Sequence, residues 1–253
     1  MKIVVIGGTG LIGSKLVAKL DAHGHEALAA APNTGVNTLT GEGVAEALAG
    51  ADVVVDVSNA PSFDEQAVLD FFTTSTTNLL DAVRAAGVRH YVALSVVGTE
   101  RLAESPYFRG KIAQERLIRD GGVPYSIVHA TQFFEFVKSI ADAATVDGEV
   151  RLSHAGIRPM AADDVASAVE RVAVAEPING VVEVAGPEQW SLDDLVRTGL
   201  EFRGDDRPVV ADPESRYFGA LLEPETLLPD PDAQLAETRF EEWLPANPLP
   251  KGR

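Results

Sequence analysis

The chain has 253 residues, a formal net charge of −17 at pH 7 and no cysteine. Its length and its 45% apolar content allow one complete hydrophobic core, so we expect a single α/β domain spanning residues 1–253. The absence of cysteine excludes disulfides and thiolate chemistry. The negative charge disfavours nucleic acid and anionic membranes as partners. Because there is no signal peptide and no run of ~18 apolar residues, we expect a cytoplasmic protein.

The first segment predicts a strand, a glycine turn and a helix. The apolar run at residues 3–6 is followed by Gly7-Gly8-Thr9-Gly10-Leu11-Ile12-Gly13, and apolar residues then continue at helical spacing to about residue 23. Glycines in such a turn let backbone N–H groups approach a pyrophosphate, and the positive end of the helix dipole faces its charge. We therefore expect a dinucleotide-binding turn whose cofactor contacts are Gly7, Thr9, Gly10, Leu11, Ile12 and Gly13.

The end of the second strand, expected at residues 26–31, bears on the choice between NAD and NADP. A carboxylate at this point would bind the ribose 2′-hydroxyl and repel a 2′-phosphate. The strand instead leads into Pro32-Asn33-Thr34-Gly35. Because Asn33 and Thr34 could donate hydrogen bonds to a phosphate, we expect a preference for NADP (NADPH) over NAD.

Apolar runs and helical stretches then alternate along the chain. Strands are expected at 53–57, 91–94, 127–128 and 181–184, and helices at 65–86, 107–119, 164–175 and 192–202. Continuous Val- and Ile-rich runs are typical of a doubly wound parallel sheet covered on both faces, with ligands at the carboxyl ends of the strands. Prolines accumulate after residue 185, so we expect a cofactor-binding core at about 1–185 and a small irregular C-terminal lobe on the substrate side at about 186–253.

Three residues suggest a catalytic group. Tyr107 and Lys111 are four residues apart in an expected helix and so share one face, and Ser95 ends the strand at 91–94. An ammonium and an oxidised nicotinamide ring beside the tyrosine would lower its pKa and allow proton transfer to or from a carbonyl oxygen. A serine at the same sheet edge could donate a hydrogen bond to that oxygen. We therefore expect Ser95, Tyr107 and Lys111 to act together, with Lys111 also holding the cofactor ribose.

The glycine turn, Ser95, Tyr107 and Lys111 occur in the order found in short-chain dehydrogenases/reductases. The sequence resembles the atypical, NmrA-like branch of that superfamily over about residues 1–185, through residues 87–92, 94–95, 111–115, 124–134, 162–166 and 184–188. The resemblance implies a Rossmann fold and a loop that contacts the adenosine and ribose of the cofactor, formed by Ser58, Asn59 and Ala60. His129 stands where relatives carry arginine, and we interpret it as a structural residue.

The segment after the strand at 127–128 should lie at the nicotinamide end. We expect Thr131 to bind the cofactor and Gln132 and Phe133 to contact the substrate. The other histidines have no metal-ligand spacing with nearby acids, so we expect no metal. The sequence does not indicate an oligomeric state.

The function that this pattern predicts is an NADPH-dependent oxidoreductase acting on a small-molecule substrate. It would reduce a carbonyl or a conjugated double bond, with Tyr107 as proton donor. Two alternatives remain open. One is a non-catalytic NAD(P)-binding redox sensor, since the tyrosine is often missing in the NmrA-like branch, and the other is a redox-neutral isomerase or epimerase.

Overall fold

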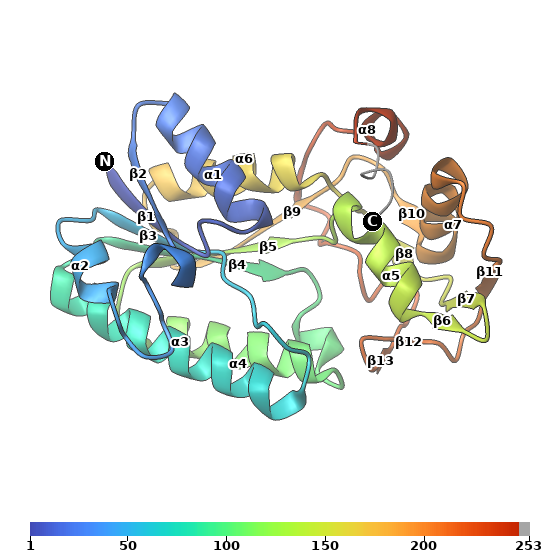
Figure 1. Cartoon of the computed structure of the whole chain (residues 1–253), viewed down its shortest axis with the longest axis horizontal. Helices are drawn as coiled ribbons and strands as arrows, with labels where there is room; N and C mark the ends of the chain where they lie inside the picture. Colours follow the sequence, from blue (N-terminus) through green and yellow to red (C-terminus); the bar gives the residue numbers. More distant parts are fainter. Residues whose placement is uncertain (248–253) are drawn as a thin grey trace.

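The computed structural model describes residues 1–247 and contains a seven-stranded parallel sheet between two layers of helices (Figure 1). The strands of this sheet are β1 (Lys2–Ile6), β2 (Glu26–Ala30), β3 (Val53–Asp56), β4 (His90–Val96), β5 (Tyr125–Ala130), β9 (Gly180–Ala185) and β14 (Gln234–Leu235). The helices that cover it are α1 (Leu11–Ala22), α2 (Val44–Leu48), α3 (Glu65–Ala86), α4 (Pro106–Asp120) and α6 (Ala162–Val174). The expected α/β, doubly wound parallel sheet of a Rossmann fold is therefore confirmed.

Both faces of the sheet are buried, which explains why its strands are continuous apolar runs. The helices α1 and α6 pack on one face, and α2, α3 and α4 pack on the other (Figure 1). Each strand sends alternate side chains into the two cores: Val5 and Val55 pack with α1 and α6, whereas Val4 and Val54 pack on the opposite face.

The strand order places a switch in chain direction beside the glycine turn. The order is β14-β9-β5-β4-β3-β1-β2, so the chain runs to one side of β1 for β2 and to the other side for β3. Ligands of doubly wound sheets bind at such a switch point, outside the carboxyl ends of the strands. Here that point lies between the ends of β1 and β3.

Local signals placed the long helices well. The helix α3 has the bounds expected for it, because Asp64 accepts a hydrogen bond from the Ala67 N–H at the start and Gly87 adopts a left-handed conformation at the end. The strand expected at 127–128 extends over six residues as β5. The short helix α2 was not expected.

The rest of the chain forms a smaller lobe with its own core. Its elements are α5 (Val137–Ala143), β6 (Thr145–Val146), β7 (Glu149–Leu152), β8 (Gly156–Ile157), β10 (Trp190–Ser191), α7 (Leu192–Arg203), β11 (Val209–Ala211), β12 (Arg216–Tyr217), β13 (Ala220–Leu221) and α8 (Phe240–Ala246). Phe134 and Val137 pack in this core with Leu195 and Phe240. The lobe thus draws on residues before 186 as well as after it.

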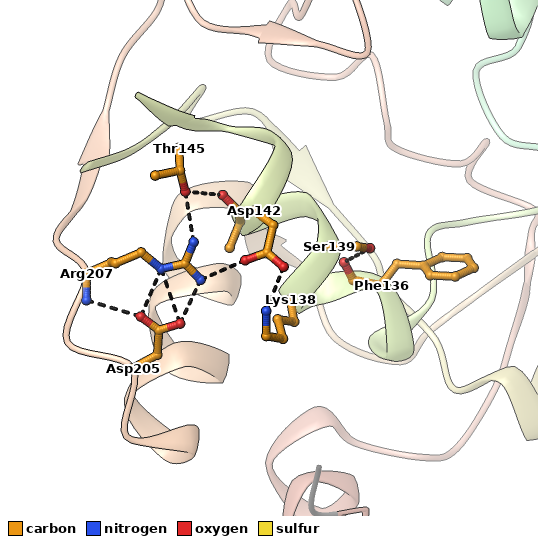
Figure 2. A network of polar contacts seen from close by, with 8 residues as sticks. Phe136, Lys138, Ser139, Asp142, Thr145, Asp205 and Arg207 are labelled. Carbon is orange, nitrogen blue, oxygen red and sulfur yellow. Dashed lines mark hydrogen bonds and ion pairs between the residues drawn. The ribbon is translucent and has the colours of Figure 1, made fainter. Parts of the chain in front are cut away.

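An arginine ties α5 to the segment that follows α7 (Figure 2). The Arg207 guanidinium pairs with Asp205 at 2.6 Å and with Asp142 at 2.9 Å, and it donates a hydrogen bond to the Thr145 hydroxyl at 2.9 Å. These hydrogen bonds and charges raise the pKa of Arg207, so its charge is permanent. The network fixes α5, which matters because this helix lines a cavity described below.

None of the helices within residues 1–247 combines the length and the apolar character that crossing a membrane requires.

Candidate active site

The glycine turn leaves no room for side chains. Gly7 has φ +76°, and a Cβ on it would lie 2.9 Å from the Ser58 backbone. A Cβ on Gly13 would lie 2.1 Å from the Gly7 carbonyl oxygen. The turn therefore needs glycine both for its conformation and for the close approach of the loop after β3. This cradle fits the pyrophosphate of a dinucleotide.

The N-terminus of α1 offers free backbone donors to such a group. Gly10 occupies the N-cap position and supplies no side-chain hydrogen bond, while Thr9, Gly10 and Leu11 are exposed. Ile12 is buried against the sheet, so it can contribute its backbone but not its side chain. An uncapped N-terminus with its dipole directed outward is suited to binding an anion.

Asn33 and Thr34, which we expect to select the cofactor, differ in how free their side chains are to bind a phosphate. Asn33 lies beside the turn and accepts a hydrogen bond from the Thr9 hydroxyl at 3.0 Å. The Thr34 hydroxyl instead caps its own 3₁₀ turn, donating to the Ala29 and Ala31 carbonyl oxygens at 3.1 and 3.0 Å. Of the two, Asn33 is the better placed to reach a cofactor phosphate.

The loop after β3 is held by a buried carboxylate. Asp56 is 1% exposed and accepts hydrogen bonds from the Ser58 hydroxyl, the Tyr91 hydroxyl and the Gln114 amide at 2.6, 3.1 and 2.9 Å. Asn59 is exposed and accepts from the N–H of Ala60. Asp56 thus fixes the loop of Ser58, Asn59 and Ala60 beside the glycine turn.

Lys111 is buried on α4. Its Nζ donates to the Leu94 carbonyl oxygen at 2.8 Å and to Gln114 Oε1 at 2.5 Å, and it lies 4.7 Å from the centre of the Phe72 ring. Burial lowers the pKa of Lys111 to about 8, while the charges of Asp56 and Glu115 oppose that shift. At pH 7 the amine is therefore still mostly protonated, but it loses its proton more easily than an exposed lysine.

Ser95 belongs to a separate buried network. Its hydroxyl donates to Glu115 Oε1 at 2.5 Å, and the same oxygen lies 2.9 Å from His129 Nε2. His129 Nδ1 lies 3.6 Å from Glu183, and Arg119 pairs with the second oxygen of Glu115 at 2.8 Å. His129 is thus a well-paired structural residue, as expected from the sequence.

The Tyr107 hydroxyl occupies an aromatic environment. Its ring lies 6.0 Å from both Phe72 and Phe63 and 5.2 Å from Phe108, measured between centroids. Burial raises the pKa of Tyr107 to about 12. The Lys111 ammonium is directed at Leu94 and Gln114, so it does not lower this pKa. The lowering that we expected beside an oxidised nicotinamide ring stays a prediction.

The three expected catalytic residues are therefore neighbours without direct hydrogen bonds among themselves in the part of the chain that the structure describes. Tyr107 and Lys111 do share one face of α4, since both contact Phe72. Ser95 faces the same helix one turn further along, at Glu115.

The segment after β5 is mostly enclosed. The Thr131 hydroxyl donates to the Arg158 carbonyl oxygen at 2.5 Å, and Phe133 stacks on Phe136 at 5.4 Å. Gln132 is 8% exposed, and neither of its side-chain polar atoms makes a hydrogen bond of standard geometry within the described residues.

Three potential metal ligands come together in the lobe. His154 is far in sequence from the adjacent pair Asp193 and Asp194, but the three residues offer ligand atoms within 4.8 Å of one another. Arg197 pairs with both carboxylates and Ser191 donates to Asp194, so these acids already have counter-charges and donors. The sequence spacing gave no indication of this group, and the absence of a metal stays a prediction.

Four polar residues of the site were not expected. Asp56 had one signal, an acid that ends an apolar strand, and Gln114 and Glu115 lie one turn beyond Lys111 on the same helix. Tyr217, described below, had none, since it lies in a hairpin far along the chain.

Comparison with known proteins agrees with this geometry. Residues 7–174 match the family model described as "NAD(P)H-binding". A photosystem II assembly factor Ycf39 from Cyanophora paradoxa is 24% identical over 84% of this chain and 72% of its own length. A (4-alkanoyl-5-oxo-2,5-dihydrofuran-3-yl)methyl phosphate reductase from Streptomyces griseus subsp. griseus is 32% identical over 64% of this chain and 58% of its own length.

The fold has close structural counterparts as well. The structure of MoeE5 in complex with UDP-glucose and NAD superimposes with a TM-score of 0.73, covering 96% of each chain at 18% identity. The turn, the sheet order and these matches agree with the resemblance to atypical short-chain dehydrogenases/reductases. The chain belongs to the NAD(P)H-binding family.

Proposed function

We propose that the protein is an NADPH-dependent oxidoreductase that reduces a carbonyl or a conjugated double bond of a small organic molecule. The observation that carries this proposal is the position of Tyr107 and Lys111 on one helix face, both against Phe72. Hydrogen bonds through Gln114 and Asp56 connect Lys111 to Ser58, which adjoins the glycine turn. The relative named as a reductase supports the same reaction class.

The residues around the switch point are suited to hold the cofactor. The glycine turn would bind the pyrophosphate, the loop of Ser58, Asn59 and Ala60 the adenosine side, and Asn33 the 2′-phosphate. When bound, the reduced nicotinamide supplies a hydride. Lys111 would donate to the ribose, for which its Nζ must give up one of its present acceptors.

Tyr107 would deliver the proton to the substrate oxygen. Its raised pKa keeps the phenol protonated, which is the form required of a general acid. Ser95 would donate a hydrogen bond to the same oxygen only after its hydroxyl turns away from Glu115. Lys111, with a pKa of about 8, can supply the proton that restores the tyrosine.

The second candidate is a non-catalytic NAD(P)-binding sensor. The observation that favours it is the relative named as an assembly factor, a description that mentions no reaction. The presence of Tyr107 in this chain ranks the enzyme first.

Replacing the proposed acid tests the reaction. Tyr107→Phe keeps the ring packing but removes the proton, so we expect turnover to fall by about 10²–10⁴-fold with cofactor affinity unchanged. Lys111→Ala should weaken cofactor binding as well. Oxidation of NADPH is followed with a panel of aldehydes, ketones and enones, and Tyr125→Phe at the other end of the sheet serves as the matched control.

Near wild-type turnover in Tyr107→Phe would exclude the tyrosine as the acid. Tight NADPH binding by the wild type without turnover would favour the sensor.

The cofactor preference is tested separately by fluorescence titration with NADPH and NADH. Asn33 is a neutral donor, so we expect NADPH to bind more tightly by only about 1–2 kcal/mol. Equal affinities, or tighter NADH binding, would contradict the preference.

A further inference from the structure

The buried amide of Gln132, which we expected to contact the substrate, marks one wall of the site considered next. Gln132 is 8% exposed, and neither its Oε1 nor its Nε2 makes a hydrogen bond of standard geometry within the described residues, while the Tyr217 hydroxyl lies beside the amide. Burying an unsatisfied amide costs free energy, so such a group is retained where it meets a ligand. Gln132 follows β5, at the carboxyl edge of the sheet where ligands of this fold bind.

A second phenol lies beside this amide. Tyr217 in β12 is buried, and its hydroxyl lies next to Gln132 and near Tyr107. The amide and the two phenols can together donate several hydrogen bonds to one oxygen atom.

The hairpin that carries Tyr217 is fixed on the start of α4. Its strands β12 and β13 are joined by Phe218 and Gly219, and a Cβ on Gly219 would lie 3.7 Å from Pro106. Arg216 pairs with Glu104 at 3.1 Å. The hairpin therefore closes over the helix turn that contains Tyr107.

The aromatic residue at the tip of this hairpin, Phe218, has an unfavourable backbone conformation. Phe218 has φ +48°, which is unusual for a bulky residue. Its ring stacks on Phe63 at 5.7 Å, and Phe63 lies 6.0 Å from Tyr107. Both rings are exposed, Phe63 by 64% and Phe218 by 39%. Two exposed rings beside the half-buried ring of Tyr107 form a surface suited to a flat apolar molecule.

A cavity of about 180 Å³ adjoins the same hairpin. It lies between the hairpin and α5, and its walls include Tyr217, Phe218, Ile140 and Leu152. Arg216 also borders it, but its guanidinium is already paired with Glu104 and bonded to the Gly219 carbonyl oxygen. Since no free cationic group faces the phenols among these residues, the chemistry favours a neutral ligand over a phosphate or a carboxylate.

We propose that Gln132, Tyr217, Phe63 and Phe218 form the substrate site for a neutral, flat, conjugated carbonyl compound. Gln132 and Tyr217 bind the carbonyl oxygen, and the rings of Phe63 and Phe218 cover the conjugated system. The inference rests on the proposed function in taking Tyr107 as the group that meets this oxygen. Gln132 and Tyr217 would bind this oxygen while the Ser95 hydroxyl still donates to Glu115.

Equilibrium binding tests the site without turnover. The probe is trans-4-phenylbut-3-en-2-one, titrated calorimetrically into the full chain with and without NADP⁺, which has no hydride to donate. Two analogues serve as matched ligands: trans-1-phenylbut-1-ene lacks the oxygen, and pent-3-en-2-one lacks the ring. We expect the probe to bind at least about tenfold more tightly than either analogue.

Variants assign the binding to named side chains. Tyr217→Phe and Gln132→Leu should each weaken binding of the ketone about fivefold, the effect of one hydrogen bond, and leave binding of the alkene unchanged. Phe63→Leu and Phe218→Leu should weaken both aromatic ligands. Tyr125→Phe and Phe202→Leu are the controls, since these residues lie at the far end of β5 and on the exposed side of α7. Thermal unfolding of each variant confirms that the fold is retained.

The outcomes separate the two proposals. Equal binding of ketone and alkene, or unchanged binding in Tyr217→Phe and Gln132→Leu, would overturn the site even where NADPH is consumed. The expected binding pattern with no consumption of NADPH would leave the site in place and overturn the catalytic function.

Discussion

His129 illustrates how one side chain can couple the stability of this fold to pH. Burial alone would lower its pKa, but hydrogen bonds and charges from Glu115 and Glu183 outweigh burial and raise it. Burial likewise opposes the lowering of the pKa values of both carboxyls, and the pairing with His129 prevails. The ion cluster therefore stabilises the fold only while the histidine is protonated and the carboxyls are ionised.

The sign of the pH dependence follows from these directions. The contribution of His129 is complete below its ordinary pKa of 6.5 and is lost as the pH rises through its raised value in the folded protein. The contribution of the two carboxyls is complete above 4.5 and is lost as the pH falls through their lowered values. The window of greatest stabilisation thus lies between about pH 5 and 6.5.

We expect His129→Gln to lower the free energy of unfolding by about 2 kcal/mol at pH 6 and by clearly less at pH 9. This is below the 3–5 kcal/mol typical of a broken buried pair, since Arg119 still pairs with Glu115. Urea unfolding at both pH values measures the difference. His23→Gln, which breaks a pair between an exposed histidine and the buried Glu170, should have a smaller effect than His129→Gln at pH 6. An equal loss at pH 6 and pH 9 would show that His129 is neutral in the folded protein.

At the level of elements, the β12–β13 hairpin has a phenylalanine, Phe218, in a strained backbone conformation at its tip. A two-residue loop with positive φ at both positions favours Asn-Gly, whereas this chain has Phe218-Gly219. A bulky residue in the left-handed region costs about 1–2 kcal/mol. The stacked ring of Phe63 offsets only part of this cost, because both rings remain exposed.

We therefore expect Phe218→Asn to raise the free energy of unfolding by about 0.5–1 kcal/mol. Urea unfolding is the measurement, and Phe218→Leu, which keeps the backbone cost, is the comparison that should show no gain. A loss of stability in Phe218→Asn would mean that the aromatic contact outweighs the strain. If Phe218→Asn is more stable but binds the ketone more weakly, Phe218 contributes to ligand binding at the expense of stability.

The same elements explain what could be predicted from the sequence. The glycine turn and α3 were placed correctly because their signals are local: glycines at fixed spacing, Asp64 before the helix and Gly87 after it. The strands β6, β8, β10, β12 and β13 have two residues each, too few to show a period. Tyr217 reaches Tyr107 only through the folding of the lobe, so no spacing in the sequence could connect them.

At the scale of the whole molecule, the final strand links the two cores. After building the lobe, the chain returns to the main sheet as β14, which pairs with Val184 and Ala185 of β9. The N–H of Ala236 donates to the Ala185 carbonyl oxygen at 2.8 Å. The lobe and the sheet should therefore unfold together.

Ala236→Pro removes that donor and tests the linkage. Both tryptophans, Trp190 and Trp243, lie in the lobe, so their fluorescence reports on it, while far-ultraviolet circular dichroism reports on the whole chain. We expect the two signals to coincide during urea unfolding of the wild type and to separate in the variant, with fluorescence changing first. Glu237→Pro, one residue beyond, should behave like the wild type. Coincident transitions in Ala236→Pro would show that the lobe is coupled to the sheet by other contacts.

The return of β14 also limits how this protein can be recombined with its relatives. A chimera cut at residue 185 would take the edge strand from one parent and its partner β9 from the other, and it would divide the lobe core between Phe134 and Phe240. A chimera designed to exchange substrate specificity must therefore replace two segments together, residues 134–161 and the C-terminal segment after residue 185.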